Sequence, residues 1–101
     1  MEVTVSKLDG VTTVTLEGRL DTPASPEVSA KLEPVMQDAT GTIVLDCGKM
    51  SYISSSGLRI FLTVRKAAAA AGGKVIVRGL TPEVRSVFMM TGFLNLFQIE
   101  E

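Results

Sequence analysis

The chain has no histidine among its 101 residues and only one cysteine, Cys47. Without an imidazole there can be no Ser-His-Asp triad, no Cys-His dyad and none of the common zinc sites. A lone cysteine also excludes an intrachain disulfide, and with no basic neighbour closer than Lys49 we interpret Cys47 as an inert, packed thiol. We therefore expect neither an enzyme nor a bound metal or cofactor.

The chain also has no large excess of charge of either sign and no long apolar run. The net charge is -1, so no broad basic field is available, and we expect no direct nucleic-acid binding. The longest apolar-leaning stretch, Ala67–Ala71, is too short for membrane insertion. Met1-Glu2-Val3-Thr4 lacks the basic start and apolar run of a signal peptide, which favours a cytoplasmic location.

The composition that remains is that of an ordinary globular protein. Hydrophobic residues make up 46% and charged residues 21% of the sequence, which argues against disorder. At this length we expect a single domain spanning residues 1–101, built around one hydrophobic core.

The first twenty residues predict a β-hairpin. Val3 and Val5 alternate with polar residues, as in a half-buried strand. Asp9-Gly10 is a strong signal for a type I′ turn, which needs positive φ at both central positions. The return strand is expected from Val11 to about Glu17, after which Gly18–Asp21 is expected to leave the sheet.

A first helix should follow, and its start is ambiguous. Either Thr22-Pro23 or Ser25-Pro26 provides a cap residue followed by proline in the first turn. Pro34 is expected to kink or shorten the helix near its end. The apolar face comprises Val28, Leu32, Val35 and Met36.

The second half alternates strands and helices. Ile43–Leu45 and Val75–Val77 are continuous apolar runs, typical of parallel strands covered on both faces. Between them we predict a helix from about Ser55 to Ala71, ended by Gly72-Gly73.

Thr81-Pro82-Glu83 begins the last main helix, and Gly92 ends it. The apolar residues from 93 to 99 predict a short turn and a terminal strand. The order is β-β-α-β-α-β-α with a possible last strand, so we predict an α/β fold with a mixed sheet and helices packed on it.

The segment after the third strand, from Asp46 to Leu58, carries the functional prediction. It is expected to be a loop that leaves the carboxyl end of a strand and enters a helix N-terminus, where backbone N–H groups favour anions. Serine is a favoured N-cap, and one of Ser54-Ser55-Ser56 suffices for that task. From these residues alone, structural capping is favoured over a functional site.

Five segments form a recognisable series along the chain: Gly18-Arg19-Leu20-Asp21, the apolar third strand ending at Asp46, Tyr52-Ile53-Ser54-Ser55-Ser56-Gly57-Leu58, Gly79-Leu80-Thr81-Pro82-Glu83-Val84 and Met90-Thr91-Gly92-Phe93. Taken in this order, they resemble the STAS family, specifically the stand-alone anti-sigma factor antagonists. The resemblance covers almost the whole chain.

This resemblance implies a regulatory switch. Such antagonists bind an anti-sigma factor that is also a serine kinase, and this frees a sigma factor. Phosphorylation ends the interaction and a phosphoserine phosphatase restores it. The family's modified serine follows an aspartate; here Ser54 replaces that aspartate and Ser55 takes the modified position, with Ser54 and Ser56 as alternatives.

The expected partner surface comprises Asp21, Ser54–Gly57 and Arg59. Arg59 lies one turn after Ser55 and can reach back toward it, although a solvated surface arginine is the simpler interpretation. Asp21 is equally compatible with a turn or cap role. Met50, Met89 and Met90 fit either an adaptable surface or the core, with core packing favoured for at least one. A monomer or weak dimer is expected.

Two other functions are compatible with the sequence. One is a permanently bound, unphosphorylated accessory subunit of a transporter or a larger signalling assembly, which a pull-down would distinguish by its partner. The other is a hydrolase with Ser55 as nucleophile, which the lack of histidine disfavours and a serine-reactive probe would test.

Overall fold

One five-stranded sheet organises the molecule. The computed structural model describes residues 1–101. The strands lie side by side in the order in which they occur along the chain, with β1 antiparallel to β2 and all later pairs parallel. This confirms the predicted mixed sheet. The strands are β1 (Glu2–Leu8), β2 (Val11–Leu20), β3 (Thr42–Ile53), β4 (Lys74–Arg78) and β5 (Gln98–Glu100).

The turn between β1 and β2 has the predicted backbone conformation. Asp9 has φ 52° and Gly10 has φ 79°, so both central residues occupy the left-handed region that a type I′ turn requires. The hairpin then pairs from Leu8 and Val11 to Glu2 and Glu17 without a shift in register.

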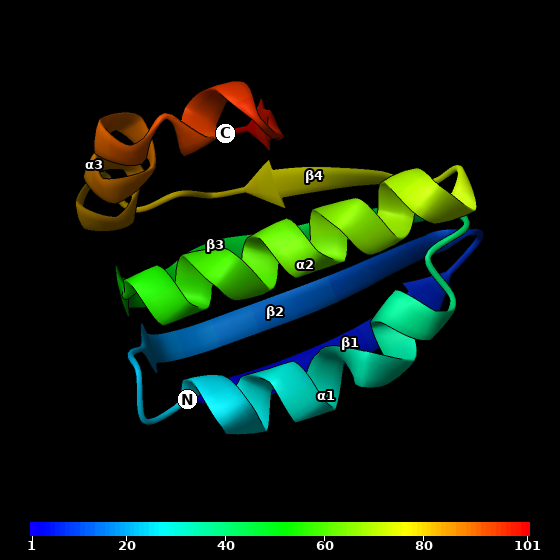
Figure 1. The fold of residues 1–101 in the computed structure, drawn as a ribbon, viewed down its shortest axis with the longest axis horizontal. Helices are drawn as coiled ribbons and strands as arrows, with labels where there is room; N and C mark the ends of the chain where they lie inside the picture. The colour runs from blue at the N-terminus through cyan, green and yellow to red at the C-terminus, as the bar shows by residue number, and fades with distance from the viewer.

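Three α-helices and one short 3-10 helix connect the parallel strands. They are α1 (Ser25–Gln37), α2 (Ser55–Ala71), α3 (Pro82–Thr91) and η1 (Phe93–Asn95). Figure 1 shows α1 and α2 side by side over one face of the sheet, with α3 beyond the end of β4. Because α1, α2 and α3 each follow a strand of the parallel set, their N-termini all lie at one end of the molecule.

The structure resolves the ambiguity at the start of α1. The helix begins at Ser25, Ala24 is its N-cap without a side-chain hydrogen bond, and Pro26 lies in the first turn. The alternative start at Thr22 is wrong. Pro34 lies inside the last turn of the helix, and the helix continues for three residues after it, to Gln37. The proline therefore does not end the helix at its own position.

The predicted first and last residues of α2 and α3 agree with the structure. α2 begins at Ser55 and ends at Ala71, and its C-cap Gly72 has φ 79° and donates its N–H to carbonyls of the last turn. α3 begins at Pro82 and ends at Thr91, with Gly92 as its C-cap. The Thr81 hydroxyl, however, does not cap α3; it donates to the Met50 carbonyl oxygen at 3.0 Å.

β2 and β3 are both longer than expected. Gly18–Leu20 does not leave the sheet, and the segment from Asp46 to Ile53 is not a loop: the two segments pair with each other. Register shifts between Thr15 and Glu17 and between Gly18 and Arg19 interrupt the regular pattern. The serine segment therefore follows directly from a strand.

The core lies between the sheet and the helices. Its centre is a group of phenylalanines, with the rings of Phe61 and Phe88 in edge-to-face contact at 5.7 Å and those of Phe61 and Phe97 at 6.2 Å. Such contacts add to the stabilisation that burial of the rings provides. α2, α3 and the segment before β5 are thus joined into one core.

The central strands were expected to be covered on both faces, and the face away from the helices differs from that expectation. Val44 and Ile76 are buried as predicted, but they lie outside the main core cluster. Their cross-strand neighbours on the same face, Thr13 and Gln98, are partly or fully exposed. The two side chains are therefore shielded by neighbours within the sheet and not by a second helical layer.

Candidate functional site

Ser54 fixes the junction between the sheet and α2. Its backbone N–H donates to the Leu20 carbonyl at the end of β2 at 2.9 Å. Its hydroxyl oxygen accepts from the backbone N–H of Gly57 at 3.2 Å, as an N-cap does. Only 8% of Ser54 is exposed. This serine is therefore the structural cap of the helix.

The next two serines have different surroundings. Ser55 is the first residue of α2, is exposed to solvent, and its hydroxyl makes no hydrogen bond within the chain. Ser56 is half-buried. The Ser56 hydroxyl likewise makes no hydrogen bond within the chain, so the three serines divide into one cap, one exposed hydroxyl and one half-buried hydroxyl.

Gly57 allows α2 to approach the sheet closely. A methyl group at this position would lie 2.7 Å from Leu20 Cγ and 2.9 Å from Ile53 Cγ1. Both neighbours belong to the buried core. The glycine is therefore required for packing, and it places the exposed Ser55 at a fixed height above the ends of β2 and β3.

Two shallow hollows flank the first turn of α2. The hydroxyl hollow, of about 360 Å³, lies between α1 and α2. Its polar lining includes Thr22, Ser25, Ser29, Ser56, Arg59 and Thr63. The apolar hollow, of about 280 Å³, lies toward α3 and η1. Its lining is Ser55, Leu58, Arg59, Leu62, Thr91 and Phe93.

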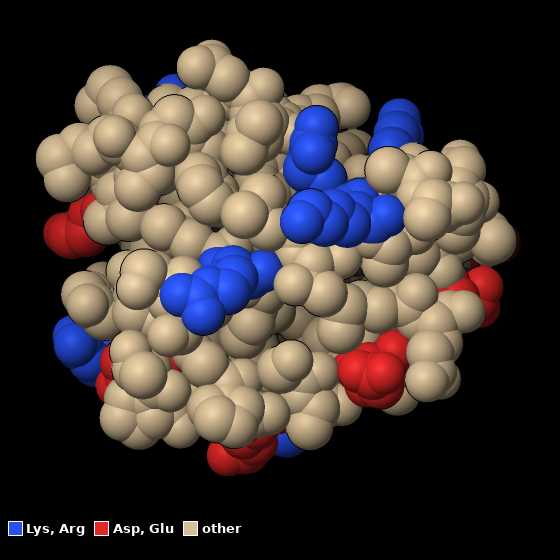
Figure 2. All heavy atoms as spheres, viewed as in Figure 1, with Lys and Arg blue, Asp and Glu red and all other residues tan.

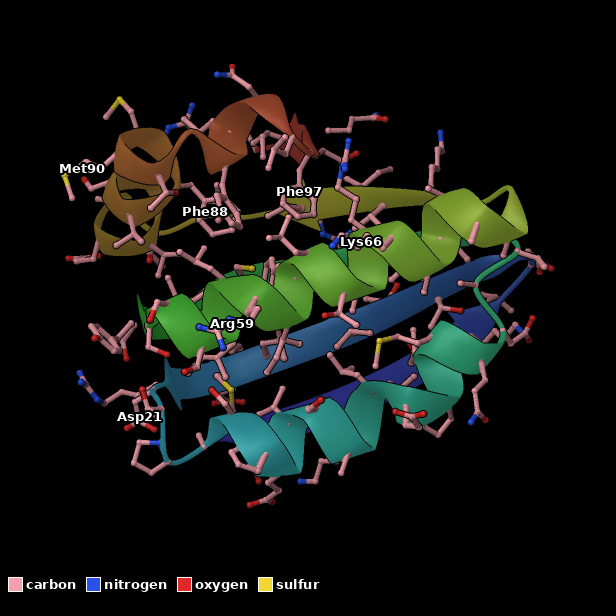
Figure 3. The ribbon with its side chains drawn as sticks, viewed as in Figure 1. Asp21, Arg59, Lys66, Phe88, Met90 and Phe97 are labelled. Atoms are coloured by element: carbon pink, nitrogen blue, oxygen red, sulfur yellow. The ribbon has the colours of Figure 1, made fainter.

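Arg59 lines both hollows and forms no ion pair. Figure 3 shows it on the outer side of α2, at the same end of the molecule as Asp21. The structure contains no hydrogen bond from Arg59 to Ser55. The guanidinium is instead exposed between the hollows, where it is available to an anion or a carboxylate.

Asp21 has a local structural task. Its Oδ1 accepts from the backbone N–H of Ala24 at 3.0 Å, and its carbonyl oxygen accepts from the Ser25 hydroxyl at 2.9 Å. These bonds form the turn that leads into α1. The side chain remains half-exposed, so a contact with another molecule is compatible with this task.

One further feature at this end, a contact between Arg19 and Tyr52, was not predicted from the sequence, whereas the methionines were already candidates for surface or core. The Arg19 guanidinium stacks on the Tyr52 ring at 4.3 Å, from neighbouring positions on β2 and β3. Met90 is 81% exposed and projects from α3 (Figure 3). Met50, in contrast, is fully buried, so the methionines divide between surface and core.

The remaining chemistry of the chain is limited. Burial, together with the nearby Asp46 charge, raises the pKa of the Cys47 thiol to about 12, which is consistent with the predicted inert thiol. No three histidine, cysteine or carboxylate side chains are grouped as a metal site would require. Likewise, none of the helices combines the length and apolarity that a bilayer crossing demands.

Comparison with known proteins supports the resemblance. The STAS domain model matches residues 2–101. The chain is 34% identical over 99 residues to BtrV of Bordetella bronchiseptica, named as an anti-sigma factor antagonist, with 98% of this chain and 85% of BtrV covered.

Two solved structures share the fold. An anti-sigma factor antagonist structure from Thermotoga maritima superimposes with a TM-score of 0.90 at 15% identity, covering 98% of this chain and 86% of that one. The Bacillus cell fate determinant SpoIIAA, solved in its phosphorylated form, gives a TM-score of 0.76 at 24% identity, covering 99% and 91%. With the match over almost its full length, the chain belongs to the STAS domain family, among the anti-sigma factor antagonists, which are regulators and not enzymes.

Proposed function

We propose that this chain, when unphosphorylated, binds an anti-sigma factor serine kinase and thereby releases a sigma factor, and that phosphorylation of Ser55 ends the binding. A phosphoserine phosphatase would restore the active form, and the exchange would take place in the cytoplasm. The observation that carries the proposal is the free, exposed hydroxyl of Ser55 at the start of α2.

The replacement of the family's aspartate by Ser54 is compatible with this function. Aspartate and serine are both good N-caps, because each offers an oxygen to an unpaired N–H of the first turn. Ser54 makes that bond to Gly57. The capping role is thus retained without a carboxylate, and Ser55 is the first residue of α2.

A phosphate on Ser55 would act on the surface and not on the fold. It adds about -1.5 to -2 charges, and a negative charge at a helix N-terminus is favourable by about 0.3–1 kcal/mol when exposed. Ser55 also lines the apolar hollow beside Leu58 and Phe93. A partner side chain that fills this hollow would have to desolvate the phosphate, which is costly.

The predicted surface residues then have distinct roles. Ser55 and Arg59 are exposed and would touch the kinase, with Arg59 pairing with a partner carboxylate. Asp21 would contact it with the half of its side chain that remains exposed. Ser54 and Gly57 are buried and would act by holding the first turn in place.

Incubation with the anti-sigma factor kinase of the same organism and ATP tests the assignment. We expect one added phosphate, which mass mapping places on Ser55. The matched variants are Ser54→Ala, Ser55→Ala and Ser56→Ala, of which only Ser55→Ala should abolish the modification. Phosphate on Ser54 or Ser56, or none with a kinase that binds the chain, would contradict the proposal.

A binding measurement tests the switch itself. Ser55→Asp should keep the circular dichroism spectrum and cooperative unfolding of the wild type while its affinity for the kinase falls at least about tenfold, equivalent to about 1.4 kcal/mol. Ser55→Ala serves as the uncharged control and should bind normally. Equal affinity of the two variants would show that charge at this position does not control binding.

A further inference from the structure

The charges of this nearly neutral chain are segregated along the sequence. No aspartate or glutamate occurs between Asp46 and Glu83, whereas the same stretch contains six basic residues. Of these, only Arg78 forms ion pairs. Three unpaired ones gather at the far half of α2 and the start of β4: Arg65, Lys66 and Lys74.

These three side chains are exposed and form one surface. Figure 2 shows basic side chains over α2 and its far end with no acidic side chain between them. Arg65 is held in position, because its Nε donates to the Leu96 carbonyl oxygen at 2.7 Å. Lys66 occupies the next position of α2, and Figure 3 shows it on that helix. None of the three forms an ion pair, so their charges have no neutralising partner within the chain.

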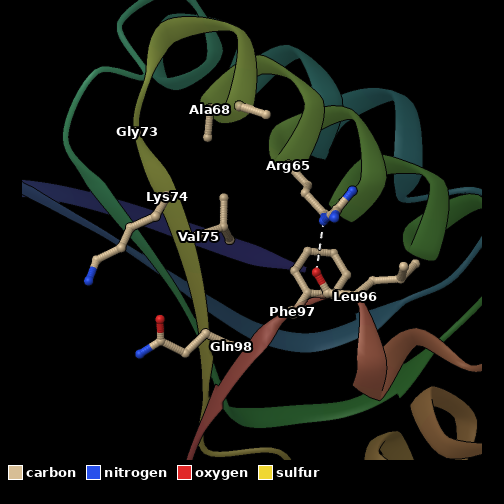
Figure 4. Close-up of a pocket in the computed structure, with 9 residues that line it drawn as sticks. Arg65, Ala68, Gly73, Lys74, Val75, Leu96, Phe97 and Gln98 are labelled. Atoms are coloured by element: carbon tan, nitrogen blue, oxygen red, sulfur yellow. Dashed lines mark hydrogen bonds between the residues drawn. The ribbon is translucent and has the colours of Figure 1, made fainter.

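Two of these basic side chains, Arg65 and Lys74, line a hollow with an apolar floor. This Phe97 hollow has a volume of about 250 Å³, and its floor includes Ala68, Val75 and Phe97. Figure 4 shows Arg65 and Lys74 on opposite sides of it. No carboxylate lines the hollow. An apolar group seated here would be flanked by positive charge.

We propose that the Phe97 hollow, lined by Arg65 and Lys74 and with the exposed Lys66 nearby on α2, forms a second protein-binding surface that takes an acidic peptide segment with one apolar anchor residue. The anchor would enter the hollow, and carboxylates on either side of it would pair with these basic side chains. This combination of a desolvated apolar anchor and charged flanks is common in peptide recognition.

The surface is distinct from the serine site. Ala68 lies thirteen residues after Ser55 on the same helix, a separation of about 20 Å along the axis. A segment bound over Phe97 would therefore leave Ser55 accessible. The chain could hold one protein at the Phe97 hollow while its switch residue meets another.

A peptide segment fits the surface better than other polyanions. Nucleic-acid binding usually neutralises many phosphates along an extended basic track, whereas here only two cations line a single apolar hollow and a third lies nearby. Stable attachment to an anionic membrane surface needs a larger basic cluster or an inserted apolar group, and the apolar residues of this hollow, Ala68, Val75 and Phe97, are buried and do not project.

Selection from a random peptide library displayed on phage, with the immobilised full chain as target, tests the proposal. We expect enriched peptides to carry an aromatic or aliphatic residue flanked by two or more acidic residues. A labelled synthetic copy should bind in a fluorescence anisotropy assay and weaken as salt rises from about 0.05 to about 0.5 M. Amide shifts in a ¹⁵N NMR titration should centre on Ala68, Val75 and Phe97.

Charge reversal provides the matched control. Lys74→Glu, at an exposed lysine that lines the hollow, should lower peptide affinity at least about tenfold, whereas Lys49→Glu, at an exposed and unpaired lysine outside this surface, should change it less than about twofold. Failure to enrich acidic peptides, equal effects of the two variants, or tighter binding of labelled DNA or phosphatidylserine vesicles through Lys74 would each overturn the proposal.

Discussion

Removal of the Ser54 hydroxyl tests whether this residue is the cap of α2 and not the switch. In the Ser54→Ala variant the Gly57 N–H loses its acceptor, which lies 3.2 Å away in the native chain. Gly57 is buried against Leu20 and Ile53, so water cannot readily replace the serine oxygen. An N–H that has been withdrawn from water would then lack a partner.

The expected cost follows from that burial. Loss of a serine N-cap destabilises a helix by about 0.5–2 kcal/mol, and a buried donor left without an acceptor costs about 1–3 kcal/mol. The two values describe the same lost bond, so we expect a decrease of about 1–2 kcal/mol in the free energy of unfolding. For a domain of this size, each kcal/mol lowers Tm by about 4–8 °C.

Urea unfolding followed by circular dichroism measures the effect, and the adjacent serine supplies the control. Ser55→Ala removes an exposed hydroxyl with no hydrogen bond and should change stability by less than about 0.5 kcal/mol. Ser54→Asp should unfold at or above the wild-type midpoint, because a carboxylate caps equally well and also interacts favourably with the helix dipole.

The comparison of the two alanine variants decides the outcome. If Ser54→Ala and Ser55→Ala were equally stable, the hydrogen bond from Gly57 would contribute nothing, and the division of tasks among the three serines would be wrong. If Ser54→Asp were less stable than Ser54→Ala, the first turn would not accommodate a carboxylate, and Ser54 could not stand in for the family's aspartate.

Three further predictions concern packing, reactivity and pH. Gly57→Ala should lower stability by about 1–3 kcal/mol in urea unfolding, because its methyl group overlaps the buried Leu20 side chain; a variant as stable as the wild type would refute the close contact. Cys47, whose pKa burial raises to about 12, should react with a thiol reagent only after unfolding, and rapid labelling of the native chain would contradict its burial. The Lys7 ammonium lowers the pKa of the Asp38 carboxyl below its ordinary 3.8, so this contribution to stability is present above that pH and is lost as pH falls through the lowered value. Urea titrations should therefore show the wild type and Lys7→Ala converging in acid, and a difference that grows in acid would reverse the sign.

Local signals explain why α2 was predicted with both ends correct. Ser54 supplies a cap just before the helix, and Gly72 supplies the left-handed residue that ends it. Both requirements involve only residues within a few positions of each helix end. Tertiary packing does not change them, so the sequence alone was sufficient.

The length of β3 could not be predicted for the opposite reason. Its second half contains Gly48, Lys49 and Ser51, which are typical of a loop, and its buried residues Met50 and Ile53 are three apart instead of two. That spacing arises from register shifts against β2, since each irregularity displaces the alternation of side chains. The pattern depends on a partner strand far away in the sequence.

The same irregular pairing explains why part of the site could not be predicted from the sequence. Arg19 and Tyr52 stack because the shifted register places them opposite each other. The motif around the serines could be recognised in the sequence, but the sequence did not indicate which of the three hydroxyls is exposed. That depends on the depth of Ser54 and on the contact of Gly57 with Leu20, both of which are properties of the packed sheet.

The pairing of β2 with the end of β3 also limits how a phosphate on Ser55 could act. The Ser54 backbone is bound to the Leu20 carbonyl, its side chain is bound to Gly57, and Gly57 packs against the core. A rearrangement of this segment would have to break both hydrogen bonds and the packing contact together, and each of them costs free energy to lose. A modification of Ser55 would therefore change the charge and shape of a rigid surface, and a partner would gain from that rigidity because no loop has to be ordered on binding.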